Sequence, residues 1–271
     1  MFIGWIRAKS FNEDLELFGA SFTIDKSLVT KTLKQDQSLC FGAYDGDKLV
    51  AFISAYELDE SYAINNFYYL DEIDENVKKR LVKLLLDNIN KNEKSVLFMS
   101  KKNELQLFSE FDFDKFAKFK KALYSGEAVA FNFSSAHSKS ISNENYISVI
   151  NSIDKRAYGE SRLAYAKDVL FKNSSLVLST QEGYQHSYAI NKTLVKISPW
   201  VMKDVAYSDA EKMLRGVIYH RGLKKLFAFV PSEVKEITDL YASYKFDMSN
   251  EYVLLYKNKK PKINLEMLYA F

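Results

Sequence analysis

The sequence is short of cysteine, histidine, glycine and proline, and each shortage excludes a kind of site or structure. Its 271 residues contain one cysteine, Cys40, so neither an intramolecular disulfide nor a multi-cysteine zinc site can form. The three histidines, His137, His186 and His220, lack metal-ligand spacing, and we expect no bound metal. With nine glycines and three prolines, loops should be short and glycine-dependent phosphate-binding turns few.

Charge and hydrophobic patterning give no sign of a nucleic-acid or membrane partner. The 38 basic and 35 acidic residues leave a net charge of +3, which is too balanced to indicate a nucleic-acid or membrane partner by itself. No apolar run reaches the ~18 residues that a membrane span needs, and the N-terminal sequence lacks the pattern of a signal peptide. We therefore expect a cytoplasmic protein, and we interpret the basic stretches Phe116–Tyr124 and Lys257–Lys262 as solvated faces.

The chain is about twice as long as a typical domain of ~100–150 residues, which predicts two domains. Hydrophobic residues make up 47% of it and aromatic residues 15%, enough for two buried cores. The most linker-like stretch is the Ser- and Asn-rich run Ser134–Asn145, at the midpoint. We therefore predict a first half of residues 1–135 and a second half of residues 145–271.

Both halves show the same predicted order of elements, which indicates a duplication. In the first half we expect a helix over 27–35, a hairpin over 38–58, a strand over 61–70, a helix over 75–90, a strand over 94–100, a helix over 104–111 and a strand over 116–124. In the second half we expect helices over 147–159 and 161–173, a hairpin over 174–190, a strand over 193–202, a helix over 208–222, a strand over 223–231, a helix over 233–244 and a strand over 250–258. The hairpins align without gaps, with Leu39 opposite Leu176 and Gly46 opposite Gly183, and Ser208 and Glu211 form a capping-box pattern.

This order of hairpin, aromatic strand, helix, buried strand, short helix and strand resembles the GCN5-related N-acetyltransferase (GNAT) family over nearly the whole chain. The resemblance is greatest in the second half, where Asp154–Arg162, Ile197–Val201 and Leu240–Phe246 are similar to the C-terminal domain of tandem bacterial GNAT proteins. The implied fold class is α/β, with two tandem GNAT-like domains, each a mixed and mostly antiparallel sheet flanked by helices.

The resemblance implies acyl transfer from acetyl-CoA, as co-substrate, to an amine acceptor that is a small molecule or a peptide. In such domains the fourth strand diverges from the fifth, and its free backbone groups pair with the pantetheine arm as an added strand would. The next turn and helix N-terminus hold the pyrophosphate through backbone N–H groups. A tyrosine on the later helix protonates the departing thiolate.

Carried onto the second half, the resemblance places a cofactor site around the strand that Pro199 interrupts, since a proline suits a strand that diverges and leaves its edge free. The implied cofactor-binding residues are Trp200, Val201, Met202, Lys203, Ser208 and Ala210. The phosphate pattern is degenerate, because Val205 stands at its basic position and Ser208 at its first glycine. Tyr241 occupies the position of the general acid, and a phenol is well matched to protonating a thiolate.

The first half departs further from the family pattern. Arg80 and Val82 stand where glycine or alanine is expected, and the preceding acidic loop, Asp71–Glu75, repels phosphate. Phe108 replaces the tyrosine and cannot donate a proton. We therefore expect a degenerate domain that serves as scaffold or specificity element. Because both halves lack the phosphate-loop glycines, a non-catalytic GNAT-like binding or regulatory protein stays open as an alternative function.

Five other residues each have a functional and a structural interpretation. Cys40, in a strand pattern with no nearby histidine, is expected to be a buried apolar residue and not a nucleophile. His186 and His220 could act as general bases, but an ordinary satisfied or surface histidine is the commoner case. Glu160 and Arg162 could line an acceptor cleft or form a structural salt bridge, and the sequence leaves both alternatives open.

Overall fold

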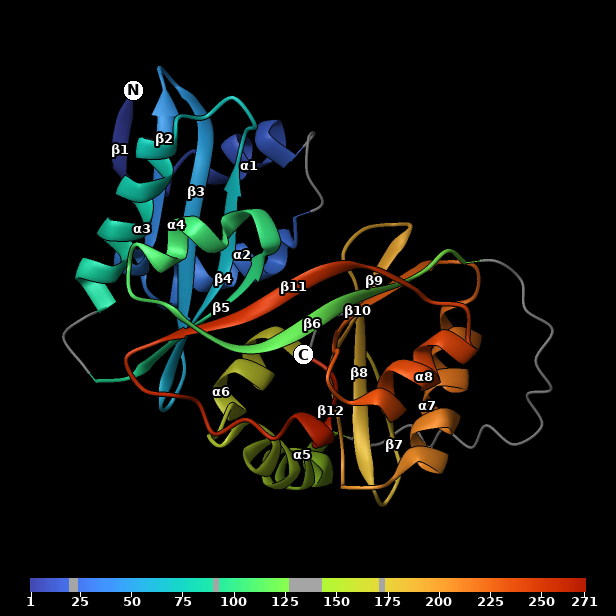
Figure 1. Cartoon of the computed structure of the whole chain (residues 1–271). Coiled ribbons are helices and arrows are strands. Elements are labelled where there is room, and N and C mark those ends of the chain that lie inside the picture. Colours follow the sequence, from blue (N-terminus) through green and yellow to red (C-terminus); the bar gives the residue numbers. More distant parts are fainter. Residues whose placement is uncertain (20–23, 90–92, 127–142, 171–173) are drawn as a thin grey trace. The chain divides into compact units, whose positions relative to one another are not determined.

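The computed structural model of the chain describes residues 1–19, 24–89, 93–126, 143–170 and 174–271 (Figure 1). The chain divides into two compact units, each described by itself below. Unit 1 comprises Met1–Phe116 and Leu254–Lys260, and unit 2 comprises Ala117–Val253 and Pro261–Phe271.

Unit 1 is a mixed sheet with helices on both faces. Its elements are β1 (Phe2–Trp5), α1 (Phe11–Gly19), α2 (Lys26–Gln35), β2 (Cys40–Asp45), β3 (Lys48–Glu57), β4 (Ser61–Tyr69), α3 (Glu75–Ile89), β5 (Ser95–Lys101), α4 (Leu105–Ser109) and the first residues of β6 (Asp114–Tyr124). Strands β1 to β4 pair antiparallel in sequence order, and β4 pairs parallel with β5. In Figure 1, α3 covers one face of β2 and β3, while α1 and α2 cover the other.

The apolar periodicity of unit 1 decides which residues enter its core. On α3, Val77, Leu81 and Leu85 recur every four residues and are buried, as the 3.6-residue helical period requires. On the strands, where alternate residues share a face, Tyr44 and Phe52 pack together with α1 in the opposite core. The predicted hairpin is confirmed: β2 and β3 join at a turn in which Gly46 has a φ of +58°, a conformation that suits glycine.

Unit 2 repeats this plan. Its elements are the rest of β6, α5 (Asn143–Tyr158), α6 (Leu163–Tyr165), β7 (Leu176–Ser179), β8 (Gly183–Ala189), β9 (Leu194–Met202), α7 (Tyr207–Arg221), β10 (Lys225–Pro231), α8 (Lys235–Ser243), most of β11 (Asp247–Lys257) and β12 (Leu268–Ala270). Strands β7, β8 and β9 are antiparallel, β9 and β10 are parallel, and β10 and β6 are antiparallel. The prediction of mixed, mostly antiparallel sheets flanked by helices is confirmed.

Two layers of helices enclose the sheet of unit 2. One core contains Trp200 and Tyr269 together with residues of α7 and α8. The other contains Val201 and Leu268 together with residues of α5. Because neighbouring residues of a strand point to opposite faces, α5 lies on one face and α7 with α8 on the other, as Figure 1 shows. Strand β9 is therefore covered on both faces.

The units do not coincide with the two halves predicted from the sequence. Residues Ala117–Tyr124 of β6 belong to unit 2, where Tyr124 pairs with Leu226 and Phe119 with Pro231 of β10. Residues Leu254–Lys260, at the end of the second half, belong to unit 1. Each half thus contributes part of its last strand to the other unit. The predicted linker lies outside the described residues as far as residue 142, and Asn143 already begins α5.

The duplication is visible in corresponding elements. β4 and β9 begin at Ser61 and Leu194, and β6 and β11 begin at Asp114 and Asp247, a spacing of 133 positions in both cases. The helix–turn segments Leu107–Phe113 and Leu240–Phe246 are also 133 positions apart, and each contains a residue with positive φ, Asp112 and Lys245. The same local conformation at matched positions supports the repeat inferred from element order.

Several elements differ from the prediction. β1, α1 and β12 were not expected, because each is short or lies outside the repeated pattern. The expected helix over 161–173 is described only as the one-turn α6 and the following π-helical turn Ala166–Leu170. The second hairpin turns over residues 180–182, so Gly183 is the first residue of β8 and not part of the turn. Within the described residues, no helix is both long and apolar enough to cross a membrane.

Candidate functional site

In each unit the fourth strand of the repeat leaves the fifth at a β-bulge. In unit 2, β9 pairs with β10 only from Leu194 to Lys196, and its pairing with β8 shifts register at Ser198-Pro199. In unit 1, β4 pairs with β5 only from Ser61 to Ile64, and the register with β3 shifts at Asn65. An extra residue on one strand bends it and increases its twist, so the bulge explains why the parallel pair separates. We call the gap between β9 and β10 beyond this point the β9–β10 opening.

The predicted divergence of the Pro199 strand is present, but its edge is not free. Strand β12 pairs antiparallel with β9, with Leu268 opposite Val201 and Ala270 opposite Trp200. On its other side, the Phe271 N–H donates to the Phe229 carbonyl of β10 at 2.9 Å. Residues of this chain therefore fill the β9–β10 opening, in the position where the sequence predicts an unpaired edge.

The predicted cofactor-binding residues lie together around this opening. Trp200, Val201 and Met202 form the end of β9 and are fully buried. Lys203 follows directly and pairs with Glu182 at 3.5 Å. Ser208 and Ala210 lie in the first turn of α7. The structure brings the six residues into one region, and their role in cofactor binding stays a prediction.

Buried polar atoms without partners lie on β12, on β9 and on the neighbouring strand β8. The side chain of Gln185 is 1% exposed, and neither its amide nitrogen nor its amide oxygen has a hydrogen bond among the described residues. Directly opposite Gln185, the buried Trp200 indole N–H also lacks a partner, as does the buried Tyr269 hydroxyl. The rings of Trp200 and Tyr269 lie 5.2 Å apart. Because buried polar groups are normally satisfied, these atoms mark a place where polar partners are expected.

Tyr241 lies under the same opening. Its hydroxyl donates to the backbone carbonyl of Tyr269 on β12 at 2.8 Å, and its ring meets Trp200 edge-on at 5.8 Å. The side chain is fully buried, and burial raises the pKa of Tyr241 well above its usual value. The phenol therefore keeps its proton in neutral solution, as a proton donor must.

The N-terminus of α7 borders the opening without a side-chain cap. The prediction that Ser208 caps this helix is wrong: the helix begins at Tyr207, Ala206 is the N-cap, and no side chain accepts a bond from the first turn. Glu211 does not reach back either, since it accepts from Tyr244 at 2.7 Å and from Arg215 at 2.7 Å. An uncapped helix start offers N–H groups and a positive dipole end to an anion.

The charges near this helix start are mixed. Asp209 lies in the first turn and pairs with Lys212 at 2.9 Å, and this hydrogen bond lowers the pKa of the Asp209 carboxyl. Lys203 and Glu182 form a partly exposed pair. Val205 precedes the helix with a φ of +63° and a side chain that is 79% exposed, an unusual conformation for a β-branched residue.

The equivalent region of unit 1 differs in two ways that disfavour acyl-CoA. Phe108 stands at the position of Tyr241, and its ring centre lies 4.3 Å from that of Phe98 and 5.6 Å from that of Phe67. Aromatic rings therefore surround this position, and no hydroxyl is available there. The start of α3 is capped, because Asp74 accepts from the Asn76 N–H at 2.8 Å. An aspartate in that place competes with a phosphate for the same N–H groups.

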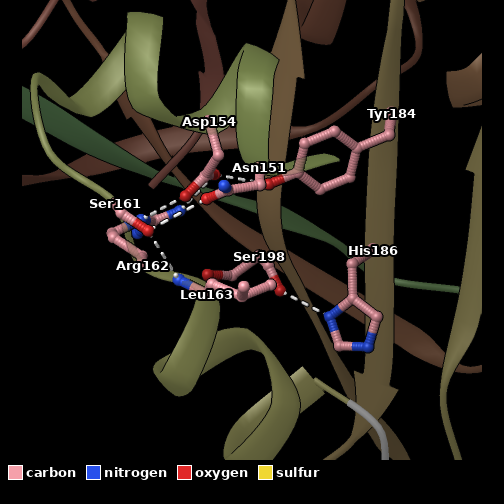
Figure 2. A network of polar contacts seen from close by, with 8 residues as sticks. All are labelled: Asn151, Asp154, Ser161, Arg162, Leu163, Tyr184, His186 and Ser198. Atoms are coloured by element: carbon pink, nitrogen blue, oxygen red, sulfur yellow. Dashed lines mark hydrogen bonds and ion pairs between the residues drawn. The ribbon is translucent and has the colours of Figure 1, made fainter. Parts of the chain in front are cut away.

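A buried ion pair fixes the end of α5, in the segment where the family resemblance is greatest (Figure 2). Arg162 donates to both carboxylate oxygens of Asp154 at 2.7 Å, and the Tyr184 hydroxyl of β8 donates to the same carboxylate. The guanidinium also lies 3.2 Å from the ring centre of Tyr158. The structure thus places Arg162 in a structural salt bridge. Glu160 is buried as well, with 7% of its surface exposed.

Two of the remaining candidates, His186 and Cys40, take structural positions, whereas His220 is exposed. Both ring nitrogens of the buried His186 are engaged, Nδ1 with the Ser198 carbonyl at 2.7 Å and Nε2 with the Ser175 hydroxyl at 3.0 Å (Figure 2 shows the first contact). Since a carbonyl only accepts, Nδ1 carries the proton, and His186 fixes the bulge of β9. Cys40 is buried as predicted, and burial raises the pKa of its thiol to about 12. No cluster of potential metal ligands occurs among the described residues.

Comparison with solved structures gives the fold its name. A candidate acetyltransferase from Pyrococcus horikoshii matches all of this chain and 93% of its own, with a TM-score of 0.79 and 15% identity. A tandem GNAT protein from the clavulanic acid biosynthesis pathway matches 94% of this chain and 98% of its own, with a TM-score of 0.65 and 9% identity. The chain has a tandem GNAT fold. The fold recognised from the sequence is therefore confirmed.

Two more solved structures match nearly the whole chain. A GCN5-related N-acetyltransferase from Sphaerobacter thermophilus matches 98% of both chains, with a TM-score of 0.63 and 11% identity. N-myristoyltransferase from Saccharomyces cerevisiae, solved with bound myristoyl-CoA, matches 97% of this chain and 80% of its own, with a TM-score of 0.61 and 10% identity. Comparison of the sequence itself finds no matching family model and no matching curated protein.

Sequence reasoning missed strand β12, the feature that most changes the site because it fills the β9–β10 opening. The segment Leu268–Ala270 is strongly apolar, and an apolar end after the basic run Lys257–Lys262 was the available signal for a buried strand. Three residues are too few for periodicity to indicate where such a strand pairs. Gln185 was also missed, because a lone glutamine on a strand carries no motif.

Proposed function

We propose that the chain is an acyl-CoA-dependent N-acyltransferase, with acetyl-CoA as the first donor to test and an amine on a small molecule or peptide as acceptor. The β9–β10 opening of unit 2 is the proposed cofactor site. The observation that carries the proposal is the juxtaposition of three features there: a strand that diverges at a bulge, an uncapped helix start, and a proton-bearing Tyr241.

Each proposed residue has a specific task. The backbone of Trp200, Val201 and Met202 pairs with the amide groups of the pantetheine arm, as an added strand would. The first N–H groups of α7, at Ser208, hold the pyrophosphate with help from Lys203. Ala210 presents only a methyl group in this turn. The partnerless indole of Trp200 and amide of Gln185 fit a polar ligand arm, which offers carbonyl and N–H groups.

The chemistry is a transfer of the acyl group from sulfur to nitrogen. A neutral amine attacks the thioester carbonyl, a C–N bond forms, and the tetrahedral intermediate collapses with cleavage of the C–S bond. Tyr241 gives its proton to the departing thiolate, the nitrogen loses a proton to water, and the Tyr241 phenolate regains a proton from water after the reaction. No side chain near the opening is assigned as base, because His186 is fully engaged at the bulge.

The non-catalytic alternative has an observation in its favour. β12 occupies the opening, and neither half has the glycines of a phosphate loop. A GNAT-like binding or regulatory protein would bind no acyl-CoA, or bind it without turnover. The neighbours named as acetyltransferases and the myristoyl-CoA-bound structure favour the enzyme, through the shared fold alone.

Two measurements on the full chain test the proposal. Isothermal titration with acetyl-CoA should show binding, and thermal unfolding should shift upward by the equivalent of roughly 2.7 kcal/mol at 100 times the dissociation constant. Incubation with a mixture of primary amines and peptides should then yield acetylated product and free CoA by mass spectrometry. Binding without product would favour the regulatory alternative, and absence of binding both by the wild type and by a folded variant with a weakened β12 would refute the acyl-CoA proposal.

A further inference from the structure

Strand β12 occupies the β9–β10 opening completely. Leu268, Tyr269 and Ala270 are each 0% exposed, and the strand contacts both walls of the opening. It uses the backbone of Trp200 and Val201, to which the proposed function assigns the pantetheine arm. Two extended segments cannot pair with the same edge of β9 at once, because each backbone group on that edge lies within reach of one neighbour only.

We propose that β12 is a displaceable strap, which closes the acyl-CoA site in the free protein and is expelled when acyl-CoA binds. This inference rests on the proposed function. The strap imitates the ligand: it is an extended segment that adds to β9 and presents its own amide groups to the opening. Acyl-CoA affinity is then set by competition between the ligand and a segment of the same chain.

The closed state leaves polar atoms unsatisfied. With the strap in place, the Trp200 indole N–H, the Gln185 amide and the Tyr269 hydroxyl are all buried without partners among the described residues. Buried orphaned groups destabilise the state that contains them. When the strap leaves, Tyr269 reaches solvent, and water or the ligand can bond to Trp200 and Gln185. Apolar packing thus stabilises the closed arrangement, while the unsatisfied polar groups destabilise it, and opening removes that destabilising contribution.

The strap also holds the proposed general acid. The Tyr241 hydroxyl donates to the Tyr269 carbonyl, which belongs to the strap backbone. Expulsion of β12 therefore frees the phenol by the same movement that clears the backbone of β9. Binding and activation of the acid are coupled, so an empty site keeps its acid engaged.

The chain before the strap is anchored, which gives the movement a hinge. The Asn264 N–H donates to the Ala157 carbonyl at the end of α5, and the Asn264 side chain caps the 3-10 turn Leu265–Met267. Two positions earlier, Lys262 packs directly against Gly159. A Cβ atom at position 159 would lie only 2.7 Å from the Lys262 carbonyl oxygen, so this contact requires glycine. Residues up to Asn264 can stay in place while the 3-10 turn and β12 swing away.

The first test weakens the strap and compares two effects of one substitution. Leu268→Ala removes buried contacts that exist only in the closed state, so it should lower the melting temperature and tighten acetyl-CoA binding by roughly tenfold or more, because the open fraction rises. Leu178→Ala is the matched control, since Leu178 on β7 is equally apolar and only 4% exposed. It should lower the melting temperature without tightening binding.

The second test fastens the strap. Val201 and Leu268 are directly opposed on antiparallel strands, where the Cα separation suits a disulfide. In the Val201→Cys/Leu268→Cys double variant, acetyl-CoA should bind after reduction and bind at least tenfold more weakly after oxidation. The single variant Leu268→Cys should show no redox effect. The native Cys40 will not interfere, because it is buried and its thiol pKa is raised to about 12.

The outcomes separate the strap from the proposed function. If wild type binds acetyl-CoA while Leu268→Ala binds no tighter and oxidation of the double variant changes nothing, the strap is refuted and acyl-CoA binding stands. If folded wild type and folded Leu268→Ala both fail to bind, the proposed function is refuted together with the strap. If Leu268→Ala binds and wild type does not, the strap is supported in its strongest form.

Discussion

At the scale of single residues, Tyr241 shows how a position can be predicted while its surroundings cannot. The segment Leu240–Phe246 resembles the family strongly enough to indicate which tyrosine to choose among 18. The partner of its hydroxyl, the Tyr269 carbonyl, lies 28 positions away on a strand without a sequence signal. Local patterns encode the residue, and its hydrogen bond depends on tertiary packing.

The substitution Tyr241→Phe tests the acid. It keeps the ring packing and removes the proton, so the turnover number should fall 10²–10⁴-fold, roughly 3–5 kcal/mol of barrier. Acetyl-CoA affinity should not weaken, because the hydroxyl bonds the strap and not the ground-state ligand. Tyr244→Phe is the control, since the Tyr244 hydroxyl donates to Glu211 and accepts from Arg215, away from the proposed thiolate position. Equal, small losses of turnover in both variants would make Tyr241 a structural residue.

The Asp154–Arg162 pair provides a second test at this scale. Arg162→Met would leave the Asp154 carboxylate, whose side chain is 4% exposed, without its positively charged partner. The free energy of unfolding measured in urea should therefore fall by about 3–5 kcal/mol. Asp154→Asn/Arg162→Met removes both charges and should be clearly more stable than Arg162→Met alone. A loss below ~1 kcal/mol in the single variant would contradict a structural role and reopen the acceptor-cleft reading.

At the scale of elements, the sequence predicts long helices with several apolar repeats well, and it predicts short elements poorly. α3 and α7 were predicted to within a residue or two, because four turns of apolar spacing leave little choice. The start of α7 was assigned to the wrong cap, since Ser208 and Glu211 fit a capping box that the fold does not use. β12 and the β9 bulge arise from contacts between distant segments, which a single sequence does not display.

The start of α7 yields a prediction about phosphate binding. Val205→Asn and Val205→Asp should both relieve the positive φ and stabilise the protein by up to about 1 kcal/mol, because Asn and Asp tolerate this conformation. Only Asp adds a negative charge, which should weaken acetyl-CoA binding relative to Asn by about 1 kcal/mol, or roughly fivefold, and more at low salt. Acetyl-pantetheine, which lacks the pyrophosphate, should bind both variants equally. Equal acetyl-CoA affinities would place the pyrophosphate elsewhere.

At the scale of the whole molecule, the prediction of a tandem GNAT fold rested on the order of elements and is confirmed by structures with 9–15% identity. What the order could not reveal is that each half contributes part of its last strand to the other unit. Ala117–Tyr124, from the first half, pairs with β10 in unit 2. A fragment cut at the predicted linker would lack a strand of the unit that holds the site, so binding has to be measured on the intact chain.

The most direct test of the account is hydrogen–deuterium exchange of the intact chain with and without acetyl-CoA. The account predicts slower exchange in β9 from Trp200 to Met202 and in the first turn of α7, with faster exchange in β12 at Leu268–Ala270. The opposite signs would arise because the ligand takes over the backbone partners that the strap gives up. Protection confined to β4 and the start of α3 in unit 1, with β12 unchanged, would contradict both the site and the strap.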